Sequence, residues 1–229
     1  MFCHNCGTQI PNDLQFCTHC GQSLAGPPLG QTPAIPWTAP PGVRSHTGQW
    51  IGSGWRLVKA DLGTYVLLAL VYILMSGIPL IKGPMTAGFH IFLMKKLLGR
   101  RAEFSDLFTG FNFFVPTLVA SLIIGLFVGV GLIFCIVGSL VVAAALQFTY
   151  LFIVDRRMDF WPAIQSSHAV VKQDYFGFTM FVIALGLLNL LGFICCLVGV
   201  LVTIPITLAA VTIAYQEIVG FDQRTIQTL

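Results

Sequence analysis

The sequence predicts an all-α polytopic membrane bundle of about six helices, arranged as three hairpins and preceded by a small cysteine-rich module. Of the 229 residues, 56% are hydrophobic and only 9% are charged, whereas soluble domains average about 25% charged residues. The formal net charge is only +3. This composition excludes a disordered chain and a nucleic-acid-binding protein that relies on bulk charge, and it argues against an ordinary cytosolic enzyme.

Three long runs without a charged residue locate the expected helices. They are residues 62–81, 107–154 and 175–216, and each of the last two is more than twice as long as the first. Because about 20 apolar residues cross the hydrocarbon core as a helix, the two longer runs fit two crossings each. Gly131 and Gly138 flank the expected turn of the second run, and Gly192 and Gly199 flank that of the third. A soluble core helix can also be apolar all round, but the length of these runs disfavours that interpretation.

A shorter run, Gly83–Met94, is the expected return helix of the first hairpin. It opens with Pro84, a residue type favoured in the first helical turn, and it is followed by Lys95 and Lys96, which can snorkel to the headgroups. The segment up to Leu98 either crosses as a short helix or lies re-entrant or at the interface. Crossing is favoured because the segment occupies the place of a return helix in the repeat described below.

The basic residues predict the orientation. With three hairpins, both termini lie on one side of the membrane, which then holds every Lys and Arg except Lys82. The basic residues on that side are Arg44, Arg56, Lys59, Lys95, Lys96, Arg100, Arg101, Arg156, Arg157, Lys172 and Arg224. The positive-inside rule assigns this side to the cytoplasm. We therefore expect a multi-pass protein of the cell membrane with both termini in the cytoplasm.

Short motifs recur along the membrane part of the chain. The sequence RRAEF at 100–104 recurs as RRMDF at 156–160, an offset of 56, and VKAD at 58–61 recurs as VKQD at 171–174, an offset of 113. These matches predict tandem units at about 50–101, 102–157 and 158–224. Each unit is expected to contain a short interfacial helix, a helix out and a helix back. Similar flanks on unrelated membrane hairpins would produce the same matches, so convergence is the alternative.

Two CxxC pairs stand at the front of the chain. Their cysteines, the expected metal ligands, are Cys3, Cys6, Cys17 and Cys20. Four thiolates form the closed tetrahedral set of a structural Zn²⁺ site, which has no open position for catalysis. Disulfides and a CxxC redox centre are the alternatives. Zinc is favoured because cytoplasmic thiols stay reduced and because so small a module needs a staple in order to fold.

The cysteine module, residues 1–24, contains no Lys or Arg, whereas binding to nucleic acid requires a basic surface. Nucleic acid is therefore a disfavoured partner, and we expect the module to bind a protein. Residues 25–49 contain six prolines and form a semi-rigid linker. The membrane domain is expected at 50–224, in contact with the lipid bilayer, and a C-terminal tail at 225–229.

Polar groups are scarce in the expected membrane segments. Those that stand out are His90, Gln147 and Asn189. They are candidates for an intramembrane site along a path between repeats, although interhelical hydrogen bonds would also explain each of them. No hydrolase or ATPase motif is found, so we expect a protein that is not an enzyme and has no catalytic residue. Gly125 and Gly129 form a GxxxG pair, which is expected to pack within the bundle or to support a homo-oligomer.

The repeated CxxCG of residues 3–21 resembles the zinc-ribbon domain at the front of many bacterial and archaeal membrane proteins. Most of residues 50–220 resembles a family of predicted bacterial integral membrane proteins of unknown function. The residues that carry this second resemblance are Gly83, Pro84, Gly88, Phe104, Leu107, Phe108, Phe111, Ala163, Ser167, Val171, Lys172, Pro205 and Tyr215. The resemblance implies an architecture but no active site.

Together these patterns predict a membrane protein whose cytoplasmic zinc ribbon acts as a protein-interaction adaptor or regulator. The closed metal site, the proline-rich tether and the uncharged membrane segments favour this function. The alternative is a transporter of small solutes or lipids, or another lipid-handling protein, with its path between the repeats.

Overall fold

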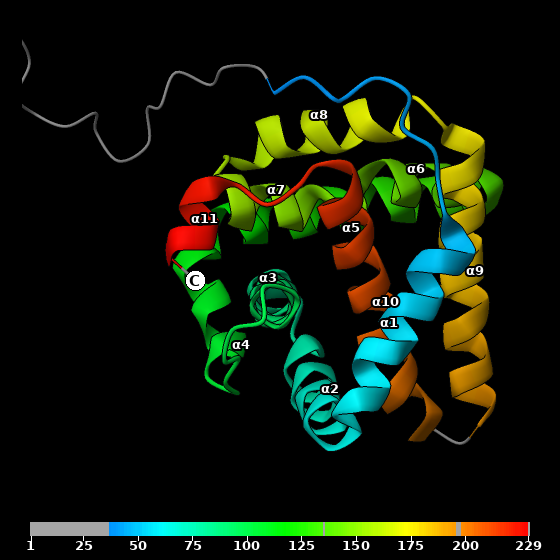
Figure 1. The fold of residues 1–229 in the computed structure, drawn as a ribbon. Coiled ribbons are helices and arrows are strands. Elements are labelled where there is room, and N and C mark those ends of the chain that lie inside the picture. The colour runs from blue at the N-terminus through cyan, green and yellow to red at the C-terminus, as the bar shows by residue number, and fades with distance from the viewer. Residues whose placement is uncertain (1–36, 135, 196–197, 229) are drawn as a thin grey trace, which may run out of the picture. The chain divides into compact units, whose positions relative to one another are not determined.

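A computed structural model describes residues 37–134, 136–195 and 198–228. From Thr38 onward the chain forms one compact unit, and within the described residues this unit contains helices but no strand (Figure 1). The helices are α1 (Thr47–Ala60), α2 (Leu62–Ser76), α3 (Pro79–Leu97), α4 (Asp106–Thr109), the 3₁₀ helix η1 (Gly110–Phe113), α5 (Phe114–Phe134), α6 (Ile136–Leu146), α7 (Thr149–Arg156), α8 (Phe160–Val171), α9 (Tyr175–Ile194), α10 (Val198–Ile218) and α11 (Gln223–Thr228).

Two breaks between long helices, α5 to α6 and α9 to α10, fall where the sequence predicts turns. α2 packs against α3, α5 against α6, and α9 against α10. The glycines that flank these two turns allow the helices to approach closely. A Cβ atom added to Gly199 would lie 2.4 Å from the carbonyl oxygen of Gly192, and one added to Gly131 would lie 3.0 Å from the Cα of Ser139. Larger residues at these positions would separate the paired helices.

The return helix of the first hairpin begins earlier than expected. α3 starts at Pro79, which occupies its first turn, and Pro84 lies inside the helix. The prediction that Pro84 opens this helix is therefore wrong. Pro79 fixes the backbone for the first turn equally well, and its missing N–H is not needed there.

Four helical segments of the described chain are long and apolar enough to cross a membrane. They are Asp106–Gly131, Gly138–Arg156, Tyr175–Ile194 and Gly199–Ile218. α1 and α2 provide a fifth only as one pair bent by 103°. By length and composition, four or five segments of the described chain thus qualify, against the about six crossing helices expected, and α3 is not among them. Every residue of α3 from Gly83 to Met94 is buried, so this helix faces protein and does not need a surface suited to lipid.

α5 and α9, in contrast, expose long apolar faces. In α5 the side chains of Leu122, Leu126 and Phe127 are each more than half exposed. Soluble proteins rarely leave such a continuous apolar surface uncovered, and together with the long apolar helices it indicates a membrane protein. Gly125 and Gly129 lie on this exposed face, with no atom within 4 Å of an added Cβ. The expectation that these two glycines pack within the bundle is therefore wrong.

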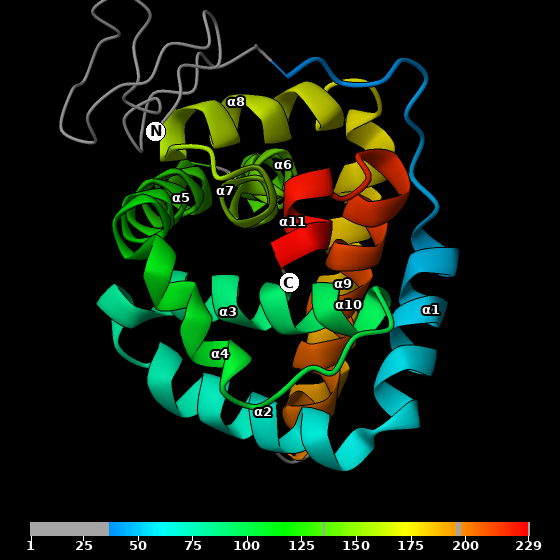
Figure 2. The same cartoon turned by 60° about the vertical axis from the view of Figure 1, so that its left-hand side comes forward.

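The helical pairs cross one another instead of lying parallel. α9 and α10 run side by side and across the direction of α5, α6 and α7, and α3 lies in the middle of the other helices (Figures 1 and 2). α8 packs on α6 and α7 and crosses over them, since Figure 2 shows α6 and α7 nearly end-on and α8 from the side. This arrangement places α3 next to η1 and α7.

Asp174 caps α9 and ties it to the segment before α1. Its carboxylate accepts hydrogen bonds from the backbone N–H groups of Gly177, at 2.9 Å, and of Ser45, at 3.1 Å. Burial by itself would raise the pKa of Asp174, but these hydrogen bonds outweigh burial and lower it. An aspartate at the N-cap satisfies one of the free N–H groups of the first turn.

The order of the elements recurs three times along the chain. α1–α2–α3, α4/η1–α5–α6/α7 and α8–α9–α10 each consist of a leading helix followed by a pair of longer helical segments. Each leading helix packs on the return helix of another unit: α4 and η1 pack on α3, α8 packs on α6 and α7, and α1 packs on α10. The third contact joins the first unit to the last, so the three units form a closed ring.

Residues at matching positions make these three contacts. A Cβ added to Gly54 of α1 would lie 3.0 Å from the carbonyl oxygen of Ile206, and one added to Gly110 of η1 would lie 2.1 Å from that of Pro84. The third matching residue is Ser167 of α8, which bonds to the backbone between α6 and α7. The intervals between these three positions differ by no more than a single position from the motif offset of 56 found in the sequence.

Candidate functional site

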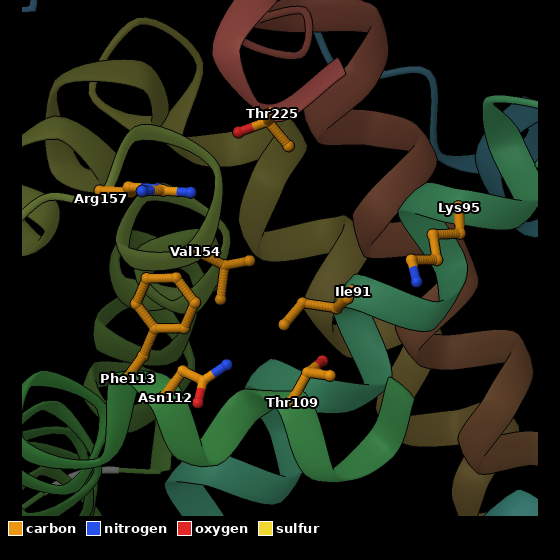
Figure 3. A pocket seen from close by; sticks show the side chains of 8 residues that line it. All are labelled: Ile91, Lys95, Thr109, Asn112, Phe113, Val154, Arg157 and Thr225. Carbon is orange, nitrogen blue, oxygen red and sulfur yellow. The ribbon is translucent and has the colours of Figure 1, made fainter. Parts of the chain in front are cut away.

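A cavity of about 440 Å³ lies among α3, η1, α7 and α11 (Figure 3). Its lining residues are Ile91, Lys95, Thr109, Asn112, Phe113, Val154, Arg157 and Thr225. The cavity lies near the start of one candidate membrane span, Asp106–Gly131, and near the end of another, Gly138–Arg156. It is therefore formed where two apolar segments meet the charged ends of neighbouring helices.

α3 supplies one wall of the cavity. Ile91 and Lys95 are four residues apart, so they lie one above the other on the same helix face. The Lys95 ammonium donates to the Asp106 carboxylate with an Nζ–Oδ1 distance of 2.6 Å. The Lys95 side chain is 19% exposed and that of Asp106 only 6%. The other Asp106 oxygen accepts from the backbone N–H of Glu103 at 2.8 Å, so the positive charge of Lys95 already has a fixed counter-charge.

Arg157 supplies the opposite wall. It ends α7 with a φ angle of 51°, in the left-handed region. Within the part of the chain that the structure describes, no carboxylate forms an ion pair with Arg157. Figure 3 shows the guanidinium of Arg157 directed across the cavity toward the wall that holds Lys95, with Val154 and Ile91 between them.

The C-terminal helix α11 is held beside the cavity by Asp155. The backbone carbonyl of Asp155 accepts from the Thr225 hydroxyl at 2.5 Å. The carboxylate of Asp155 accepts from the Tyr215 hydroxyl at 2.9 Å and from the backbone N–H of Asp222 at 3.0 Å. Because these bonds join residues that are 60 to 70 positions apart, they fix the last helix against the end of α7.

The three polar residues singled out from the sequence lie in three different helix contacts. His90 of α3 is buried, with its Nδ1 atom 2.8 Å from the Thr212 hydroxyl of α10. Asn189 of α9 donates to the Thr207 hydroxyl of α10 at 2.8 Å. Gln147 lies at the break between α6 and α7, where its buried amide atoms have no hydrogen-bond partner among the described residues.

The described structure therefore does not unite His90, Gln147 and Asn189 in one site. Asn189 lines a separate cavity of about 640 Å³, together with Lys82. In the sequence, Lys95 and Arg157 bear on the orientation, the helix end and the repeat, and nothing there identified them as lining residues of a cavity. The repeated RR pair was a signal that could have directed attention to Arg157, but the contact between α3 and α7 that creates the cavity cannot be inferred from it.

The front of the chain, in contrast, is identified by comparison with known protein families. Residues 2–24 match the zinc-ribbon domain. The predicted ligands Cys3, Cys6, Cys17 and Cys20 fall inside this match and lie outside the described residues. Comparisons with curated proteins and with solved structures gave no match.

The donor set of the zinc ribbon fits the metal. Zinc-ribbon domains generally bind Zn²⁺ structurally, and four cysteine thiolates satisfy its tetrahedral preference. Among the described residues, which exclude these cysteines, there is no group of three or more His, Cys, Asp or Glu that could hold a metal ion. The chain is thus a protein with an N-terminal zinc-ribbon domain followed by several helices capable of crossing a membrane.

Proposed function

We propose that the protein is a membrane-anchored adaptor whose zinc ribbon binds a protein partner. The observation that carries this proposal is the combination of a zinc-ribbon match at residues 2–24 with four membrane-capable segments in the same chain. A set of four thiolates leaves no coordination position for substrate, which favours binding over catalysis. The absence of Lys and Arg from residues 1–24 favours a protein over a nucleic acid as partner.

Replacement of ribbon cysteines tests this function. Full-length protein carrying Cys3→Ser and Cys17→Ser should lose bound zinc, measured by elemental analysis, and should lose its specific crosslinked partners in cells. The matched control is Cys195→Ser, because Cys195 is an exposed free cysteine at the end of α9. The control should retain both zinc and partners. Identical partner sets for wild type and the ribbon variant would refute the adaptor function.

We further propose that both termini face the cytoplasm, as the distribution of basic residues favours. Cys195 follows α9 on the opposite side of this topology. In a background with Cys135 and Cys196 replaced by serine, a membrane-impermeant maleimide applied to intact cells should label Cys195 and leave the ribbon cysteines unlabelled until the cells are opened. Labelling of the ribbon in intact cells would reverse the topology and remove the argument for reduced thiols.

A second candidate function is the handling of a lipid or small solute. It is favoured by the cavity beside Asn189, where the Asn189 Oδ1 atom is buried without a partner among the described residues. Replacing His90, Gln147 and Asn189 together by apolar residues of similar size should then abolish a transport or lipid phenotype. A triple variant that is folded and retains such a phenotype would exclude these residues from the path.

A further inference from the structure

The three return helices are each followed within two residues by a residue in the left-handed conformation, but the residue type differs. The chain leaves α3 and α10 through left-handed glycines, Gly99 with a φ of 70° and Gly220 with a φ of 72°. It leaves α7 through Arg157, which is the only non-glycine residue of the described chain with a positive φ. Glycine adopts this conformation freely, whereas a residue with a Cβ atom is strained in it. The chain thus holds an arginine where a glycine would fold more easily.

The side chain of Arg157 indicates why this position is not a glycine. It extends into the 440 Å³ cavity, toward Lys95 on the opposite wall (Figure 3). Lys95 is paired with Asp106, whereas no carboxylate of the described residues pairs with Arg157. Arg157 is thus an exposed residue that lines the cavity, has no carboxylate partner among the described residues, and holds a strained backbone conformation. Such strain is typically found at binding and functional sites.

The remaining lining residues define the kind of anion that fits. Asn112 adds an amide that can donate hydrogen bonds, while Ile91, Phe113 and Val154 form an apolar surface beside the charge. The cavity lies at the ends of two candidate membrane spans, which is the depth at which basic pockets meet lipid headgroups. A guanidinium presents paired N–H groups that match two oxygens of a phosphate.

We propose that this cavity binds a phosphate-bearing anion, with Arg157 as its main ligand. Two sources share this chemistry: the headgroup of an acidic phospholipid, and a soluble phosphate compound. The apolar surface beside Arg157 favours the phospholipid. This site is independent of the zinc ribbon, so it can exist whether or not the ribbon acts as an adaptor.

Binding by the purified full-length protein in detergent tests the proposal. Native mass spectrometry would compare bound phosphatidylglycerol with phosphatidylcholine in wild type and three variants. Arg157→Asn removes the charge but suits the backbone, since Asn tolerates the left-handed conformation. Arg157→Lys keeps the charge and loses the paired donors. Arg101→Asn is the matched control, because Arg101 is an exposed arginine that does not line the cavity.

Wild type and Arg101→Asn should prefer phosphatidylglycerol by about tenfold or more, Arg157→Lys should keep part of this preference, and Arg157→Asn should lose it. Glycerol phosphate and inorganic phosphate are the soluble probes, and their effect on thermal unfolding is measured for wild type and Arg157→Asn. If they protect wild type but not Arg157→Asn, and no lipid preference is found, the ligand is a soluble phosphate compound. Equal binding by wild type and Arg157→Asn in both arms would overturn the proposal. If Arg157→Asn does not fold, Asn112→Leu takes its place, with the same loss expected and the same result overturning the site.

Discussion

The three contacts that close the ring of units use two kinds of chemistry. At two of them a glycine, Gly54 or Gly110, lies directly against the backbone of an unbroken return helix. At the third, Ser167 faces a return helix that is interrupted between α6 and α7. Its hydroxyl donates to the carbonyl of Ala145 at 2.7 Å and accepts from the N–H of Phe148 at 3.2 Å.

The difference shows how the same helix contact is made both on an unbroken return helix and on one that is interrupted. The two unbroken return helices each contain a proline near the contact, Pro84 in α3 and Pro205 in α10, so there is no backbone N–H at that point. At the contact with α6 and α7, a break leaves both a donor and an acceptor in a buried place, and a buried backbone group without a partner is costly. Glycine is sufficient where only close approach is needed, and serine is needed where the backbone requires a partner.

The largest effect is expected for Gly110→Ala. The new Cβ would lie 2.1 Å from the carbonyl oxygen of Pro84 and 2.4 Å from the backbone nitrogen of Gly88. Neither atom can move without moving α3, so the free energy of unfolding in detergent should fall by about 3 kcal/mol or more. Gly125→Ala is the control, because nothing lies within 4 Å of its Cβ and alanine favours helix. Similar losses in both variants would contradict the close contact.

Ser167→Ala should have the next largest effect. The methyl group fits the space, but the Ala145 carbonyl and the Phe148 N–H lose their partner. Leaving buried backbone groups unpaired should reduce the free energy of unfolding by about 2 kcal/mol. Ser121→Ala provides the comparison, since the Ser121 hydroxyl bonds only within its own helix, to the carbonyl of Leu118. If the two serine variants have equal stability, the serine contact is no more than a spacer.

The same comparison shows what could be predicted from the sequence. The charge-free runs and their glycines predicted the turns after α5 and α9, because both signals depend only on neighbouring residues. The motif offset also predicted the threefold order of elements. That each leading helix packs on a different unit could not be predicted, since it depends on contacts such as Gly54 against Ile206, which join the first unit of the chain to the last.

The surroundings of α3 could not be predicted for a related physical reason. α3 is buried among other helices from Gly83 to Met94, and its lysines and glycines lower its mean hydropathy without making it a surface segment. The cavity was missed in the same way. Lys95 and Arg157 look like ordinary flanking charges in sequence, and only the arrangement of α3 against α7 brings them to one cavity.

Gly54→Ala should have a smaller effect than Gly110→Ala and thereby rank the two glycine contacts. Its added Cβ would lie 3.0 Å from the Ile206 carbonyl oxygen and 3.1 Å from the backbone nitrogen of Ala210. A small shift between α1 and α10 would relieve this overlap. We therefore expect a loss of about 1 kcal/mol in the free energy of unfolding, measured alongside Gly110→Ala. A loss as large as that of Gly110→Ala would show that the two contacts are equally tight.

The smallest effect, and one of opposite sign, is expected at the break between α6 and α7. Gln147 has buried amide atoms without partners among the described residues, so Gln147→Leu removes a desolvation cost and should raise the free energy of unfolding by up to about 1 kcal/mol. Asn189→Leu should instead lower it by about 1 kcal/mol, because the Asn189 amide donates to the Leu185 carbonyl and the Thr207 hydroxyl. Loss of stability in Gln147→Leu would mean that the amide has a partner, such as water or a bound solute. The break between α6 and α7 would then be a binding position, and the lipid- or solute-handling function would gain the site that the described contacts do not provide.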